Sequence, residues 1–117
     1  MNLQENLKMT GELTISVFDR NGNLKTAQHV PNLVVTVGKN FIASRIVGTA
    51  SPIMSHMAIG TGTATPAAGD TTLGTELGRV SLAGSAVSTN TITYTATFPA
   101  GTGTSTSPGI QEAAIFN

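Results

Sequence analysis

The stretch "TNTITYTATFPA", residues 89–100, alternates between two kinds of side chain along its whole length. The apolar and aromatic set comprises Ile92, Tyr94, Ala96 and Phe98, and the set between them comprises Thr91, Thr93, Thr95 and Thr97. Successive side chains of a β-strand point to opposite faces of the sheet, so this pattern predicts a strand with one inward apolar face. The other face is β-branched and polar, as on the outside of a sheet.

The same period of two recurs near the start of the chain. Residues 12–18, "ELTISVF", predict a strand whose inward side chains are Leu13, Ile15 and Val17. The Asn21-Gly22 pair then predicts a tight hairpin in which both turn positions have positive φ. A second arm is expected over residues 24–36, where Pro31 marks a bulge or an edge, since proline cannot donate to a ladder. Further strands are predicted over residues 53–60, 79–87 (with a glycine kink) and 110–117.

One segment changes to a helical period. Over residues 38–47, Phe41, Ile42 and Ile46 fall on one side of a short helix, with Val37 ahead of them. We expect this apolar side to plug one end of the β core. The strands and the single helix together predict an all-β fold, a jelly-roll-like β-sandwich or small barrel with one short helix at about residues 38–47.

The chain length fits one such domain. We expect a single β domain over residues 10–117, preceded by a flexible N-terminal arm over residues 1–9, "MNLQENLKM". That terminus lacks the basic flank and apolar centre of a signal peptide, and no apolar run approaches the roughly 18 residues of a membrane span. The chain has no cysteine, which excludes disulfides and thiolate metal sites and fits synthesis in a reducing cytosol.

Charge is unusually scarce. Only 10% of the residues are Asp, Glu, Lys or Arg, and the formal net charge is zero, whereas about 25% is ordinary for a globular domain. Such a surface gives little repulsion between copies and suits a protein that is packed among neighbours. It also argues against nucleic acid, because binding phosphates needs a basic stripe.

The segment "SHMAIGTGTATPAAGD", residues 55–70, raises the question of a nucleotide-binding loop. In the dinucleotide fingerprint a third glycine should stand where this chain has Thr65, and Pro66 follows. A phosphate loop would need Gly-Lys-Ser or Gly-Lys-Thr, but Lys39 is followed by Asn40. We therefore interpret the loop as a turn in which Gly60 and Gly62 let the chain leave a strand, with Asp70 as a capping or turn residue.

Other chemical motifs are incomplete as well. His29 and His56 fall in separate strands without a paired carboxylate, and we expect both to be partly buried. "DRNGN", with Asp19 at its start, resembles the beginning of a calcium loop, but a hairpin turn explains these residues without a bound ion. Ser85 lacks the glycine spacing of a nucleophile elbow, and no two carboxylates are placed to act as general acid and general base. We expect no enzymatic activity, no cofactor and no metal.

Several segments resemble a known family when they are read in order. They are "TGELTISVFDRNGNLKTAQHVPNLVVTVGKNFIASRI", "SHMAIGTGTATPAAGDTTLGTELGRV", "ITYTATFPAGTG" and "EAAIFN", which cover almost the whole chain from Thr10 to Asn117. The series looks like that of small virion proteins of tailed bacteriophages, which include head-cementing, tail-fibre and baseplate-associated proteins. Similar chains usually continue past "EAAIFN" into one or two more strands, so either a neighbour completes the last strand or this form is short.

The resemblance implies a structural role in the virion. One reading is a capsid decoration protein, a homo-oligomer that binds the major capsid protein on the outer shell and stabilises it. The other is a tail fibre, collar or baseplate module. In either case no nucleic acid or membrane is expected as a partner, and the chain would be made in the host bacterial cytoplasm. From the residues at the two ends, the candidate subunit contacts are Leu3, Leu7, Met9, Ile115 and Phe116.

Overall fold

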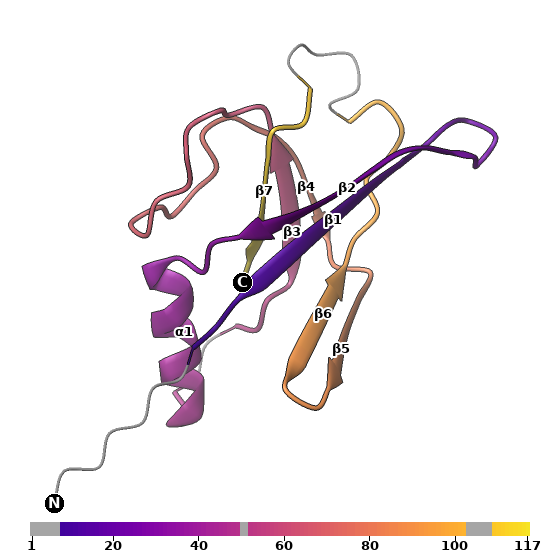
Figure 1. Ribbon diagram of the computed structural model, residues 1–117. Coiled ribbons are helices and arrows are strands. Elements are labelled where there is room, and N and C mark those ends of the chain that lie inside the picture. The colour runs from indigo at the N-terminus through magenta and orange to yellow at the C-terminus, as the bar shows by residue number, and fades with distance from the viewer. Residues whose placement is uncertain (1–7, 50–51, 103–108) are drawn as a thin grey trace, which may run out of the picture.

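Strands dominate the architecture, and they form three small antiparallel sheets (Figure 1). The computed structural model describes residues 8–49, 52–102 and 109–117. Within them the elements are, in chain order, β1 (Gly11–Phe18), β2 (Leu24–Asn32), α1 (Thr36–Ile46), β3 (His56–Gly60), β4 (Glu76–Ser81), β5 (Gly84–Ser88), β6 (Thr91–Thr95) and β7 (Glu112–Phe116). The sheets pair β1 with β2, order the central strands β4-β3-β7, and pair β5 with β6. The all-β prediction with one short helix is confirmed.

The first sheet is a long hairpin that extends away from the rest of the molecule (Figure 1). Leu13, Ile15 and Val17 are half-buried while the residues between them are exposed, so the predicted alternation of β1 is confirmed. Every residue of β2 is exposed. Pro31 pairs with Glu12 on a strand that has β1 as its partner within the described residues, which confirms that the proline marks an edge.

The turn of this hairpin differs from the predicted tight turn. It spans Asp19 to Asn23, and Gly22 alone has positive φ, +83°, while Asn21 does not. The Gly22 N–H donates to Asp19 O at 3.0 Å, and the Asp19 N–H donates to Asn23 O at 2.8 Å. The prediction of two positive-φ positions was wrong because the Asp19 side chain builds a longer turn, whose bonds are described below.

Helix α1 begins two residues earlier than predicted and ends one residue earlier. Phe41 and Ile42 are half-buried, but Val37 is 49% exposed and Ile46 is 73% exposed. No residue of the helix is fully buried. The expectation that its apolar side plugs the β core was therefore wrong, because that side stays largely open in the single chain.

The central sheet holds the core. Ala58 (0% exposed) and Ile59 (5% exposed) of β3 are the buried apolar residues among those described. Strand β3 lies between two neighbours, so its backbone is paired on both edges and side chains of β4 and β7 flank its own on each face. Met57, Val80 and Ile115 share one face of this sheet through the cross-strand pairs Met57↔Val80 and Met57↔Ile115. All three are half-buried, which makes this face the larger apolar layer of the sheet.

The segment predicted as one kinked strand over residues 79–87 is two strands instead. Strand β4 ends at Ser81 and β5 begins at Gly84, in a different sheet. The chain is fixed at this corner because the Leu82 N–H donates to Ser55 O and the Ala83 N–H donates to Thr95 O. The glycine thus stands at a change of sheet and not at a kink within one.

The β5–β6 hairpin keeps the alternation that the sequence shows. Val87 pairs with Ile92 and Ser85 pairs with Tyr94, so these four side chains share one face. The threonines of β6 lie on the other face and are exposed, as predicted. Ile92 was expected to face inward, but it is 54% exposed, because no element of the described chain covers this end of the hairpin. Strand β6 ends at Thr95, earlier than the predicted limit of residue 100, although Phe98 beyond it is half-buried.

The molecule is elongated, with extents of 61 × 29 × 25 Å. Its radius of gyration is 16.1 Å, whereas about 13 Å is expected for a compact chain of this length. Large apolar side chains remain exposed at Met9, Phe18, Leu24, Val30, Leu33, Val37, Ile46, Val47, Ile53, Val87 and Ile92. The two packed sheets of a jelly roll are not confirmed by this arrangement.

Within the described ranges, no helix has the length and apolar character that a membrane span needs.

Candidate subunit-contact site

Strand β7, which carries the candidate contacts Ile115 and Phe116, lies at one edge of the central sheet. It pairs with β3 on one side, in the register Met57↔Ile115 and His56↔Phe116. No strand of the described residues pairs with its other side. Ile115 and Phe116 point to opposite faces of the sheet, because they are adjacent in a strand. Both are half-buried, so the part of β7 that is open to a partner is the backbone of its outer edge.

Phe116 has a partner within the chain. The Arg79 guanidinium carbon lies 3.8 Å from the centroid of the Phe116 ring, a cation–π arrangement. In the register, Arg79 of β4 stands opposite Ala58 of β3, and Ala58 stands opposite Ala114 of β7. The small side chain of Ala58 lets the arginine cross β3 to reach the ring. This crossing accounts for the complete burial of Ala58.

The same arginine is held by a carboxylate. Arg79 Nε and Nη2 donate to Glu76 Oε1 and Oε2, each at 2.9 Å, which is a bidentate pair. Hydrogen bonding to Arg79 lowers the pKa of Glu76, and the same bond raises the pKa of Arg79. Glu76 and Arg79 of β4 therefore form one row with Phe116 of β7, and this row crosses β3 at Ala58.

The glycine loop binds an anion, but that anion is the chain's own Glu112. Glu112 Oε1 accepts the Gly62 N–H at 2.9 Å and the Thr75 N–H at 2.7 Å, and Oε2 accepts the Gly74 N–H at 2.9 Å. A Cβ built on Gly62, or on Gly60, would lie 2.5 Å from Glu112 Oε1. Gly62 is therefore required by the close approach of a carboxylate, and Gly60 is required first by the Thr75 carbonyl oxygen, which a Cβ there would meet even more closely. The loop is no phosphate cradle. We call these three bonds the Glu112 clamp.

The pKa of Glu112 reflects this setting. Partial burial acts to raise the pKa, but the N–H donors of Thr75, Gly74 and Gly62 together outweigh it and hold the pKa below its ordinary value of 4.5. The carboxylate is therefore ionised at neutral pH and occupies the nest that its donors form.

The clamp closes a loop that in turn positions the helix. The Thr61 N–H donates to Thr75 O at 2.9 Å, so the two ends of the loop over residues 61–75 meet. At its tip, Ala68 O accepts the Thr36 N–H at 2.8 Å. The preceding residue, Val35, makes no side-chain cap, so the loop satisfies a donor that the start of α1 would leave open. Asp70 forms the predicted turn, because its Oδ2 accepts the Ala67 N–H.

The N-terminal candidates are only partly covered by the structure. Met9 is 39% exposed. Leu3 and Leu7 lie outside the described residues, as does most of the arm expected over residues 1–9.

"DRNGN" is a hairpin turn, as the sequence suggested. Asp19 Oδ1 accepts the N–H groups of Asn21 and Asn23, at 2.8 and 2.9 Å. The bond from the Asn23 N–H is the largest cause that lowers the pKa of Asp19. Among the residues that the structure describes, no three His, Asp or Glu side chains gather where they could hold a metal ion.

The exposure and the partner of His29 differ from what the sequence predicted. It is exposed, and it has a carboxylate partner on the neighbouring strand, with Nε2 3.2 Å from Glu12 Oε2. Its Nδ1 lies 2.8 Å from Thr14 Oγ1. This row of hydroxyl, imidazole and carboxylate lies in water on a hairpin face, and we interpret it as cross-strand pairing that stabilises the hairpin. His56 is half-buried as expected, with Nδ1 2.7 Å from Ser55 Oγ.

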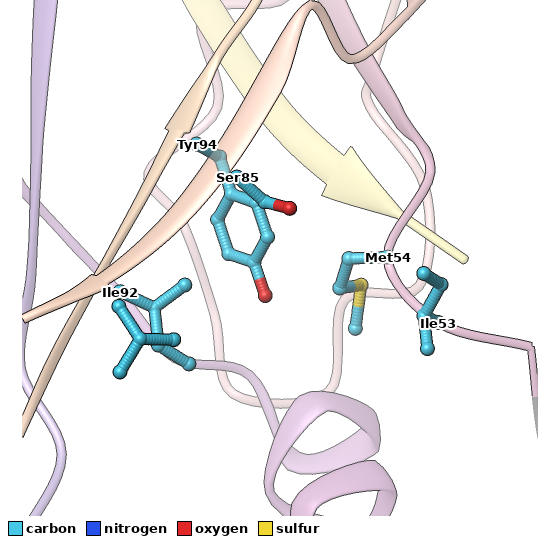
Figure 2. A pocket seen from close by; sticks show the side chains of 6 residues that line it. Ile53, Met54, Ser85, Ile92 and Tyr94 are labelled. Atoms are coloured by element: carbon cyan, nitrogen blue, oxygen red, sulfur yellow. The ribbon is translucent and has the colours of Figure 1, made fainter.

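A shallow groove of about 200 Å³ lies between the β5–β6 hairpin and the segment before β3 (Figure 2). We call it the apolar groove, lined by Ile53, Met54, Ser85, Val87, Ile92 and Tyr94. Figure 2 shows the Tyr94 ring standing between Ile92 on one side and Met54 with Ile53 on the other. The groove is smaller than the roughly 300–1,000 Å³ of small-molecule sites, and its lining has only two hydroxyl groups to orient a ligand.

Comparison of the chain with models of known protein families found no match, and comparisons with curated proteins and with solved structures found none either.

Proposed function

We propose that this chain is a structural protein of a tailed-bacteriophage virion, acting as a homo-oligomeric decoration protein on the outer capsid shell. The observation that carries the proposal is the small number of buried apolar side chains compared with the number that are exposed. Ala58 and Ile59 are the fully buried apolar residues of the described chain, while many large apolar side chains remain in water. Burial of apolar area is the main favourable term in folding, so a chain with so small a core gains most from neighbours that cover it.

Charge and shape agree with assembly. A formal net charge of zero leaves little repulsion between packed copies. Within the described part of the chain no strand pairs with the outer edge of β7, so another strand can add to it. The bacteriophage assignment itself rests on the ordered resemblance of the sequence segments from Thr10 to Asn117.

The test is binding to capsids that lack the protein. Particles of the phage that encodes the chain are prepared from a deletion strain, mixed with purified chain and sedimented. We expect the chain to sediment with the particles and to raise the temperature at which they release DNA. A variant without residues 1–9 is the matched probe of the N-terminal contacts, and we expect it to show reduced occupancy.

A tail fibre, collar or baseplate module is the second candidate, and the elongated shape of 61 × 29 × 25 Å suits it. Electron microscopy of labelled chain on the same particles separates the two sites. Label over the head supports decoration, and label confined to the tail supports the second candidate. No association with either part of the particle would contradict the virion role.

A further inference from the structure

Asn21 is the one asparagine of the chain that is followed by a glycine. Leucine, phenylalanine or threonine follows every other internal asparagine. An asparagine side chain loses ammonia when the backbone nitrogen of the next residue attacks its amide carbon, and a side chain on that next residue obstructs the attack. Gly22 has no Cβ and therefore obstructs it least. The sequence thus places the most reactive asparagine amide of the chain at residue 21.

The structure leaves this amide open to water. Asn21 lies in the turn between β1 and β2, at the end of the hairpin that extends away from the other sheets (Figure 1). It is exposed, as are the residues on either side of it. Asn40, by contrast, lies inside α1, where the regular backbone holds the following N–H in a helical hydrogen bond. Exposure and the absence of a following side chain therefore coincide at Asn21.

The turn itself restrains the reaction through Asp19. The nitrogen that would attack is that of Gly22, and its N–H donates to Asp19 O at 3.0 Å. Asp19 Oδ1 accepts the N–H groups of Asn21 and Asn23, which fixes the backbone on both sides of that nitrogen. The nitrogen must lose its proton and turn toward the Asn21 side chain before it attacks, so the reaction requires the turn to open. Local opening of an exposed turn costs far less free energy than global unfolding.

We propose that Asn21 is a site of spontaneous deamidation whose rate is controlled by the turn over residues 19–23. In the open turn the Gly22 N–H gives its proton to hydroxide, and the nitrogen forms a bond to Cγ of Asn21. The Cγ–Nδ2 bond breaks, the leaving nitrogen takes a proton from water and departs as ammonia, and a succinimide ring remains. Water then adds to either ring carbonyl and gives aspartate or isoaspartate. Water is the only co-reactant, and no group is oxidised or reduced.

The product cannot keep the same turn. Isoaspartate carries the main chain through the former side chain of residue 21, which lengthens the backbone inside the turn. Either product also places a new carboxylate close to that of Asp19, and like charges repel. Among the described residues β1 and β2 pair only with each other, so we expect deamidation to loosen this hairpin and to leave the central sheet unchanged.

Peptide mapping of the full chain by mass spectrometry tests the site. Purified chain is kept at mildly alkaline pH, sampled over time, digested and mapped for peptides whose mass shows conversion of an amide to an acid. We expect Asn21 to convert at least about tenfold faster than Asn40 or Asn90, because Gly22 leaves the attack unobstructed. Conversion at Asn21 that is no faster than at the other two positions would overturn the proposal.

Three variants test the control by the turn. Asp19→Ala removes the side-chain acceptor, and we expect Asn21 to convert about fivefold faster than in the parent protein because the turn opens more often. Asp19→Asn removes the charge but keeps a side-chain oxygen that forms the same kind of turn, so its rate should stay near that of the parent. Asp70→Ala is the matched control, because Asp70 Oδ2 accepts the Ala67 N–H in a similar turn of another loop. It should leave the rate at Asn21 unchanged.

Each of three results would contradict control by the turn. The first is an equal rate in the parent and in Asp19→Ala. The second is an Asp19→Asn rate as high as that of Asp19→Ala, which would assign the restraint to charge and not to hydrogen bonds. The third is an equal acceleration by Asp70→Ala, which would indicate a general loss of structure.

Amide hydrogen exchange tests the consequence for the hairpin. The deamidated form carries one more negative charge than the parent, so ion exchange separates the two. We expect faster exchange in β1 and β2 of the deamidated form and unchanged exchange in β3, and equal exchange in β1 and β2 would contradict the loosened hairpin. All of these measurements use purified chain without capsids, so they leave the proposed function untouched.

Discussion

Removing the Glu112 carboxylate should destabilise the protein by a predictable amount. Glu112→Ala deletes three hydrogen bonds from the backbone N–H groups of Gly62, Gly74 and Thr75. Bonds to a charged acceptor contribute about 1.5–3 kcal/mol when they are shielded, and neutral ones about 1 kcal/mol. Two of the three lie at the surface, so we take about 1 kcal/mol for each bond and expect a loss of about 3 kcal/mol. Glu112→Gln keeps one oxygen acceptor and should lose less.

Urea denaturation at one fixed protein concentration measures this loss. With a slope of about 2 kcal/mol per molar urea, the midpoint of Glu112→Ala should fall by roughly 1.5 M. Glu12→Gln is the control, because it removes an exposed carboxylate whose pairing with His29 lies in water, and it should lower the midpoint by less than about 0.5 M.

The effect should also depend on pH with a defined sign. The pKa of Glu112 is lower in the folded protein than its ordinary value of 4.5, so its contribution is complete above that value and is lost as the pH falls through the folded pKa. The free-energy difference between the parent protein and Glu112→Gln should therefore be constant near neutral pH and shrink below pH 4.5. A midpoint of Glu112→Ala equal to that of the parent, or a difference that is independent of pH, would refute the clamp.

Three further outcomes are expected. Gly62→Ala should lower the urea midpoint, whereas Gly69→Ala should not, because a Cβ at position 69 meets nothing within 4 Å. The double variant Gly62→Ala with Glu112→Ala should lose less free energy of unfolding than the two single variants together, and strict additivity would contradict the close approach. Thr89→Gly should raise the free energy of unfolding by about 1 kcal/mol in the same assay, because Thr89 has φ of +50°, a costly conformation for a β-branched residue. A destabilised variant would show that the Thr89 side chain contributes more to stability than its backbone strain costs. Occupancy on particles should change little between low salt and ~1 M salt, because apolar burial and backbone bonds are not screened; release by salt alone would point to charged contacts.

The strands were predictable because their signal is local. The alternation of Leu13, Ile15 and Val17 with polar residues fixes which side of β1 faces inward, whatever packs there. Likewise, Pro31 excludes a central strand by its missing donor alone. The pairing of Tyr94 with Ser85 follows once the turn between β5 and β6 is placed.

The spacing of apolar residues along a helix or strand does not reveal whether its apolar face is covered. Val37 and Ile46 fall on the expected side of α1, yet both are exposed because no element of the described chain closes over them. Phe18 is 60% exposed for the same reason. Whether an apolar side chain is buried depends on what other segments or chains pack against it. The residue pattern within one segment does not show this.

The Glu112 clamp could not be predicted from spacing, because its donors lie up to fifty residues away along the chain. A signal nevertheless existed in the sequence. Gly62 follows directly after a strand, and backbone N–H groups in such glycine-rich turns can bind an anion. Glu112, near the start of the last predicted strand, is the carboxylate that binds there.

The measurement that tests the account most directly is the copy number of this chain in purified virions, by quantitative mass spectrometry against the major capsid protein. The account predicts copies in a fixed ratio to the major capsid protein, at a number comparable to that of the shell subunits. Absence of the chain from purified virions would contradict the account, and a copy number matching a single tail ring would contradict the capsid role.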